Sequence, residues 1–261
     1  MIAHCHAHHQ ARTERAFSLS DLVGLLGALS LVAMVVLGRM VHAGQGSRTL
    51  ACVANQQALG RIWALYAYDH SEVVANNLQI TETQDTVNRR EYATWANNVL
   101  DWASTPFNTN LSLMATGQFA VYLDSNPGVF KCPADKFPCP FGPRVRSVSM
   151  NTYMSRPAWD PSYEKYSQLA KPAMLWVFVD EHPDSINDGV FSTLSGSITK
   201  WNDLPASYHN GACGFAFADG HSEIKKWRNP NTKRPVLRQQ SPGGIVAPED
   251  VAWVWQRTYN Q

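Results

Sequence analysis

Residues 17 to 38 read FSLSDLVGLLGALSLVAMVVLG, and this apolar run decides the architecture that we expect. As a helix with about 1.5 Å rise per residue, the run would cover roughly 33 Å, close to the hydrocarbon thickness of a bilayer. Its one charged residue, Asp21, is costly in such a helix unless it has a partner. Because Arg12 and Arg15 precede the run, we predict a transmembrane segment with a cytoplasmic start and an exported remainder.

Two other interpretations of the apolar run stay open. A signal peptidase could cut after the small-residue pattern Val41-His42-Ala43, which would release the remainder as a secreted protein. The run could also serve as an uncleaved anchor. The residue found at the mature N-terminus distinguishes the three cases.

The composition predicts one globular domain beyond the apolar run. The chain has 261 residues, so about 200 residues remain, enough for a core of their own. The 22 Lys and Arg residues nearly balance the 21 Asp and Glu residues, and the basic cluster over residues 225–228 is short. We therefore expect no nucleic-acid partner.

Four cysteines lie in the part that would be exported: Cys52, Cys132, Cys139 and Cys213. Cys132 and Cys139 flank a Pro-rich loop and could form a disulfide, although a bridge between Cys52 and Cys132 fits the sequence as well. A zinc site is less expected, because no CxxC spacing is present.

Hydrophobic periodicity predicts an amphipathic helix after the apolar run. Apolar residues recur at three- and four-residue steps from Leu50 to Tyr66. Residues 44–47, which include two glycines, interrupt the pattern between the two helical segments. Two further helices are expected around residues 90–103 and 111–122.

Strand-like runs fill much of the second half of the chain. We expect strands over residues 145–153 and 174–179. Residues 214–218 and 223–227 should form a hairpin, because Asp219-Gly220 is a favoured turn dipeptide between them. A short C-terminal helix should begin at Pro248.

The N-terminal residues resemble the type IV prepilin and pseudopilin signature. In that family a short basic leader is cut before a Phe, and an acid stands at the fifth mature position. Ala16, Phe17 and Asp21 hold these places, with Ala16 and Asp21 replacing the usual Gly and Glu. The resemblance implies a leader over residues 1–16, cleavage and methylation by a prepilin peptidase, and a part for Asp21 in assembly.

The remainder resembles a large pseudopilin-like family defined by a His, nine residues and then Asp-Gly. His209, residues 210–218 and Asp219-Gly220 meet this spacing. Shorter pieces match in the same order: Cys52-x-x-Asn55, Cys132-Pro133-Ala134-Asp135, Arg146-Ser147-Val148-Ser149-Met150-Asn151, Val179-Asp180-Glu181 and Asp250-x-x-Trp253. The resemblance implies an α+β, pilin-like fold: a long N-terminal helix, transmembrane over residues 17–38, and an antiparallel sheet in a periplasmic head over residues 47–261.

The function that the resemblance implies is structural. We expect a membrane-anchored pseudopilin-like subunit of a type II secretion-like or type IV pilus-like filament, without enzymatic activity. Its expected partners are copies of itself, other pilin-like subunits, the prepilin peptidase, the membrane and an inner-membrane assembly platform, and its expected location is the inner membrane with the head in the periplasm. Two alternatives stay open: a lectin-like binding domain, suggested by nine tryptophans, and a metal-dependent hydrolase.

The hydrolase alternative rests on His209, Asp219 and His221, whose side chains are of the types that serve as metal ligands and general bases. No serine or cysteine nucleophile motif accompanies them. Asp219 is equally well explained by hydrogen bonding within its turn. We therefore expect His209, Asp219 and Gly220 to be structural.

The loop after residue 179 concentrates hard oxygen donors: Asp180, Glu181, Asp184 and Asp188. These carboxylates could coordinate Ca²⁺, although their spacing is not that of an EF-hand. The alternative is an ordinary turn rich in Asp and Asn after a buried strand. No other cofactor is expected.

Overall fold

The computed structural model describes residues 18–259, except 104, 125, 156–161, 194–197 and 242, and leaves out the side chains of residues 36 and 38–43. The predicted cleavage site, Ala16 and Phe17, lies outside the described residues. The chain forms two compact units, Met1–Gly44 and Gln45–Gln261, which are described separately below. Helix α1 (Leu19–Asp69) contributes its first part to one unit and its second part to the other.

In the first unit, Ser18 and Asp21 close the first turn of α1. The Ser18 amide and hydroxyl donate to Oδ2 of Asp21 at 3.0 and 2.6 Å, and the Asp21 amide donates to the Ser18 hydroxyl at 3.2 Å. Reciprocal bonds of this kind cap helix N-termini, and the bonds from Ser18 lower the pKa of Asp21. Asp21 therefore has a local role in starting the helix.

Within the described part of the chain, no helix is both long enough and apolar enough to span a membrane. A span needs about 20 consecutive, predominantly apolar residues. The predicted transmembrane helix over residues 17–38 and the single-pass location in the inner membrane are therefore wrong on this finding. The transmembrane part of the predicted fold class is corrected with them.

The second unit is built on a five-stranded sheet with the order β3-β1-β2-β5-β6. Its strands are β1 (Val148–Asn151), β2 (Trp176–Asp180), β3 (Val190–Phe191), β5 (Ala212–Phe217) and β6 (Ser222–Lys226). Pairing is antiparallel except between β1 and β3, which run parallel. The predicted antiparallel sheet is thus corrected to a mixed one, because the chain passes β1 after leaving β2, and β3 joins the edge beside β1 and parallel to it.

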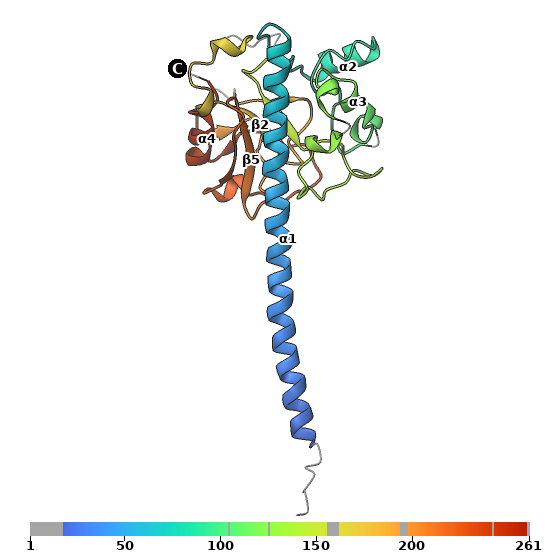
Figure 1. The fold of residues 1–261 in the computed structure, drawn as a ribbon, viewed down its shortest axis with the longest axis vertical. Helices are drawn as coiled ribbons and strands as arrows, with labels where there is room; N and C mark the ends of the chain where they lie inside the picture. The colour runs from blue at the N-terminus through green and yellow to red at the C-terminus, as the bar shows by residue number, and fades with distance from the viewer. Residues whose placement is uncertain are drawn as a thin grey trace, which may run out of the picture. The chain divides into compact units, whose positions relative to one another are not determined.

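One face of the sheet packs on the second part of α1, and Figure 1 shows α1 beside β2 and β5. Trp63 and Ala67 of the helix belong to the same buried cluster as Phe178 and Ala216 of the strands. The approach is close, because a Cβ on Gly60 would lie 3.5 Å from that of Ala216. The amphipathic helix predicted from Leu50 onward is confirmed, and it continues through residues 44–47 without the predicted interruption.

The opposite face of the sheet packs on helix α4 (Pro248–Trp255), which starts at the predicted proline. Val251 and Val254 of α4 join Trp176 and Phe215 of the strands in a second buried cluster. Strands β2 and β5 are therefore buried on both faces of the sheet. This explains why β2 reads as a continuous apolar run that ends in Asp180.

The remaining elements are short. Helices α2 (Ile80–Asn88) and α3 (Ser112–Ala115) and the strand pair β4 (Lys200–Trp201) and β7 (Ile245–Val246) complete the unit. The predicted helix over residues 90–103 is wrong, because the described residues there are irregular. Arg90 and Tyr92 adopt positive φ, and the buried Trp95 donates to Asn77 at 2.9 Å, so tertiary contacts outweigh helical propensity.

The predicted hairpin is confirmed as β5 and β6, which pair in an unbroken register from Ala212 with Lys226 to Ala216 with Ser222. Gly220 has φ +89° in the turn and donates its amide to the Phe217 carbonyl at 3.0 Å. Few residues other than glycine adopt this conformation. The register places Phe215 and Phe217 in the buried cluster beneath α4.

A matched pair of glycine substitutions tests this account of the turn. Gly220→Ala should lower the free energy of unfolding by about 1 to 2 kcal/mol, because its φ is unfavourable for a residue with a Cβ. Gly46→Ala should raise it by up to about 1 kcal/mol, since Gly46 is helical and open space surrounds its Cβ position. Urea unfolding of both variants is the measurement, and equal effects in the two would contradict the account.

Candidate functional site

Four side chains from four separate segments converge inside the second unit: Cys52, Cys132, Asp180 and His209. One potential metal ligand atom from each lies within 4.8 Å of those from the other three. Cys52 comes from α1, Cys132 from the Pro-rich loop, Asp180 from the end of β2 and His209 from the turn before β5. The first three are buried, while His209 is partly exposed.

Direct contacts join these four groups in pairs. Cys52 Sγ donates to Oδ2 of Asp180 at 2.9 Å, and Cys132 Sγ lies 3.2 Å from Nε2 of His209. The hydrogen bond between the two cysteines and the burial of the site raise the pKa of Cys52. The bond with Cys52 lowers the pKa of Cys132, but burial and the nearby carboxylates together raise it by more. Without a metal, both sulfurs are therefore thiols at neutral pH rather than reactive thiolates.

The carboxylate of Asp180 is fully buried. Its Oδ1 accepts a bond from the Ser147 hydroxyl at 3.4 Å, and the Ser147 oxygen accepts the Cys132 amide at 2.8 Å. Burial raises the pKa of Asp180 to about 7. Among the described residues, no lysine or arginine forms an ion pair with it.

Each ring nitrogen of His209 has its own partner. Nδ1 lies 3.1 Å from the Thr49 hydroxyl, which is also 3.0 Å from the Gln45 carbonyl. Nε2 lies 3.2 Å from Cys132 Sγ. In the tautomer that carries its proton on Nδ1, Thr49 accepts that proton and the lone pair of Nε2 faces Cys132.

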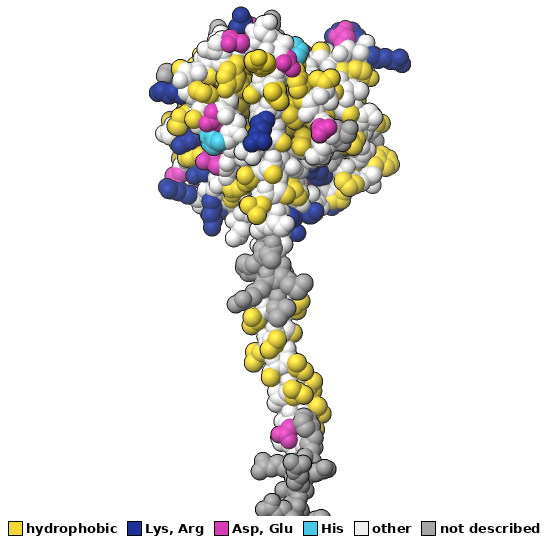
Figure 2. All heavy atoms as spheres, in the orientation of Figure 1, with side chains coloured by type: hydrophobic (Ala, Val, Ile, Leu, Met, Phe, Trp, Pro, Cys, Tyr) yellow, Lys and Arg dark blue, Asp and Glu magenta, His cyan; other side chains and the backbone are white. Residues whose placement is uncertain are grey.

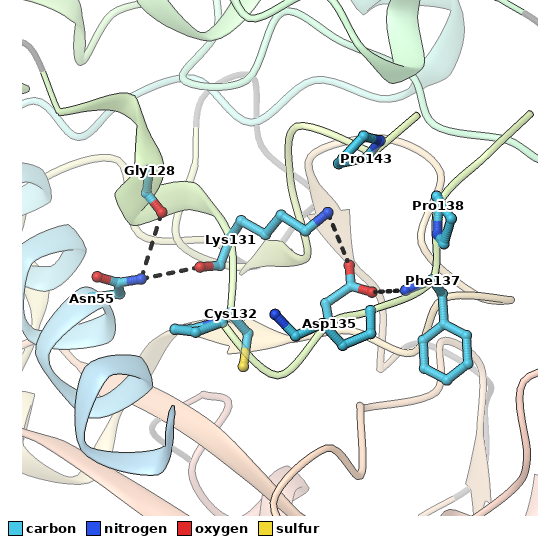
Figure 3. A pocket seen from close by; sticks show the side chains of 10 residues that line it. Asn55, Gly128, Lys131, Cys132, Asp135, Phe137, Pro138 and Pro143 are labelled. Carbon is cyan, nitrogen blue, oxygen red and sulfur yellow. Dashed lines mark hydrogen bonds and ion pairs between the residues drawn. The ribbon is translucent and has the colours of Figure 1, made fainter. Parts of the chain in front are cut away.

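A pocket of about 480 Å³ lies beside the cluster, with Cys132 on its wall. Figure 3 shows Asn55 of α1 donating to the Lys131 carbonyl, and Lys131 reaching toward Asp135. The Asp135 carboxylate also accepts the Phe137 amide at 3.0 Å. These contacts hold the Pro-rich loop against the helix, next to the four converging side chains.

The structure separates the residues of the hydrolase alternative. Asp219 accepts the amide and the Nδ1 of His221, two residues away in the turn. His209 instead contacts Thr49 and Cys132. His209 and Asp219 therefore lie beyond opposite ends of strand β5 and do not form one site.

The four residues of the predicted calcium site take different hydrogen-bond partners. Glu181 accepts the Ser185 hydroxyl, while Asp184 and Asp188 accept the amides of Leu237 and Val190. The converging group found among the described residues contains Asp180 but none of these three. Calcium binding stays a prediction, and the four carboxylates do not converge on one position where an ion could bind them all.

Neither of the two disulfides considered from the sequence is formed among the described cysteines. Cys139 Sγ donates to the Gly142 carbonyl at 3.3 Å, and all four described cysteines are free thiols. Cys132 instead has Cys52 as its near neighbour. The sequence contained a signal for the four converging side chains. Cys52, Cys132, Asp180 and His209 each lie in a different one of the short motifs that resemble the pseudopilin-like family.

Comparisons with known proteins return no relative for this chain: no family model matches it, and neither does a curated protein or a solved structure. No related protein therefore supports the predictions that depend on a named system. These predictions are a pseudopilin, prepilin cleavage and methylation, type II secretion and a periplasmic location. Together with the absence of a membrane-spanning helix among the described residues, this corrects them.

Calcium dependence of thermal unfolding tests the acidic loop. We expect the melting temperature of the full chain to be the same in millimolar Ca²⁺ and in chelator, because the four carboxylates do not meet. The Asp184→Asn/Asp188→Asn double variant is the control and should respond in the same way. A calcium-dependent rise that is absent from the double variant would instead place the ion in this loop, since a ligand that binds only the folded state must stabilise it.

Proposed function

We propose that this protein is a pilin-like structural subunit that assembles with copies of itself through the first part of α1. The observation that carries the proposal is the exposure of the large apolar side chains of this segment, from 43% for Leu22 to 78% for Leu19. Figure 2 shows the apolar side chains gathered on this segment. A helix that is apolar on all sides requires burial against other elements.

Copies of the same chain are the occupant that we propose for this surface. Identical helices in a bundle would bury the same side chains on every subunit, which is how symmetric assemblies form. The resemblance of Ala16, Phe17 and Asp21 to the prepilin signature also supports this proposal.

The burial of several tryptophans disfavours the alternative of a lectin-like binding domain. Five of them are buried: Trp63, Trp95, Trp176, Trp201 and Trp227. These five side chains are therefore unavailable for stacking on a sugar.

Asp21 would act twice in such an assembly. It caps its own helix through Ser18, and its carboxylate would pair with a positive group of the neighbouring subunit. A charge inside an apolar bundle is strongly disfavoured unless it is paired.

Two leucines with nearly equal exposure test the assembly surface. Leu29 is 55% exposed in the first unit and Leu237 is 57% exposed in the second. Leu29→Gln should shift the full chain toward monomer, raising the concentration required for assembly by about tenfold, whereas Leu237→Gln should not. Sedimentation velocity and negative-stain microscopy make the comparison, and a wild-type chain that stays monomeric would rule the proposal out.

Substitutions at Asp21 and Ser18 separate the cap from the intersubunit pair. Asp21→Ala removes both functions, while Ser18→Ala weakens the cap and keeps the carboxylate. We expect Asp21→Ala to abolish assembly, Ser18→Ala to retain it, and Asp21→Glu to assemble at least as well as wild type. Equal losses in the Asp21→Ala and Ser18→Ala variants would show that Asp21 serves only as a cap.

A further inference from the structure

We propose that Cys52, Cys132, Asp180 and His209 form a structural zinc site that fastens α1 to the sheet. The site is independent of the assembly surface, since all four residues belong to the second unit. It joins four segments that are distant in the sequence: the helix, the Pro-rich loop, the end of β2 and the turn before β5.

The spacing of the donor atoms fits a tetrahedral ion. Zinc bonds of about 2.0 to 2.3 Å to nitrogen, oxygen and sulfur place neighbouring donors about 3.3 to 3.8 Å apart. In this structure the four donor atoms lie within 4.8 Å of one another, and two of the contacts are 2.9 and 3.2 Å. Small side-chain shifts would therefore complete the coordination shell.

The donors are also oriented toward one point. Nε2 of His209 faces Cys132, while Nδ1 contacts Thr49, and a partner on the second ring nitrogen is typical of ligating histidines. Ser147 holds Oδ1 of Asp180, while Oδ2 faces Cys52. Thr49 and Ser147 are thus positioning residues for two of the four ligands.

Gly214 keeps space open beside Cys52 and Asp180. A Cβ at this position would lie 2.9 Å from both Cys52 Sγ and Oδ2 of Asp180, which is closer than real Cβ atoms approach other atoms. Gly214 belongs to β5, the strand that follows His209. The glycine lets the helix sulfur and the strand carboxylate lie against the sheet.

The chemistry of the set selects the metal. Two sulfurs and an imidazole favour Zn²⁺ over Ca²⁺ or Mg²⁺, which take oxygen ligands. Four protein ligands close a tetrahedral shell and leave no position for a substrate, so the site is structural. On binding, the two thiols would release their protons to water. The two thiolates and the carboxylate of Asp180 would then face the doubly charged ion, which leaves the site with one net negative charge, as in zinc sites of three cysteines and one histidine.

The test measures metal bound by the full chain. His4, His6, His8 and His9 could also bind zinc, so the parent protein carries these four as Gln. Under reducing conditions, the parent should bind one Co²⁺ with thiolate charge-transfer and tetrahedral ligand-field absorption, and Zn²⁺ should displace it and raise the melting temperature. A parent without this absorption overturns the proposal.

Matched variants locate the bound ion. Cys52→Ser and Cys132→Ser should abolish the charge-transfer band or reduce it, while Cys139→Ser should keep it, because Cys139 is buried and free but lies outside the group. His209→Gln should weaken zinc binding, and His221→Gln should not. Equal binding by Cys52→Ser, Cys139→Ser and the parent would place the metal elsewhere and refute the site.

Two further measurements keep the test decisive if a cysteine variant fails to fold. Thr49→Val leaves all four ligands in place but removes the partner of Nδ1, and it should weaken zinc affinity by about 10- to 100-fold. Unchanged affinity in that variant counts against the site. Peptide mass spectrometry of protein isolated without reductant should show free Cys52 and Cys132, and a disulfide between them would replace the zinc site with an oxidised pair.

Discussion

The packing of the second part of α1 on the sheet is the constraint on which the rest of the second unit depends. Trp63 and Ala67 bury their side chains against β2 and β5, and Gly60 allows the helix to approach Ala216 closely. Buried apolar area of this kind supplies most of the stability of a domain. Because one helix face must follow the sheet, the positions of the residues on preceding turns are fixed as well.

The same helix face carries Thr49 and Cys52 toward its beginning, where the apolar contacts give way to polar ones. A buried polar group is costly unless it is hydrogen-bonded, and each of the four candidate ligands has a partner here. Asp180 meets Cys52 and Ser147, while His209 meets Thr49 and Cys132. The helix that organises the core therefore also brings the candidate metal ligands together.

Local sequence patterns predicted several elements correctly, and they failed where distant contacts decide. The hairpin of β5 and β6 follows from Asp219-Gly220, and α4 starts at Pro248 as expected. The helix predicted over residues 90–103 was wrong, because Trp95 is buried by residues from other segments. The predicted transmembrane segment was wrong as well, and the predicted antiparallel sheet became mixed through the pairing of β1 with β3.

By itself, the sequence determined the helix from Leu50 onward, the strand over residues 174–179 and the turn at Gly220, because periodicity and turn chemistry depend only on neighbouring residues. The structure shows that strand as β2, Trp176–Asp180. The sequence also contained Cys52, Cys132, Asp180 and His209 in separate short motifs. Only the tertiary structure decided that these four residues meet. The reason is physical: contacts between distant segments are set by how a helix and a sheet bury their apolar faces together, and no local pattern records that packing.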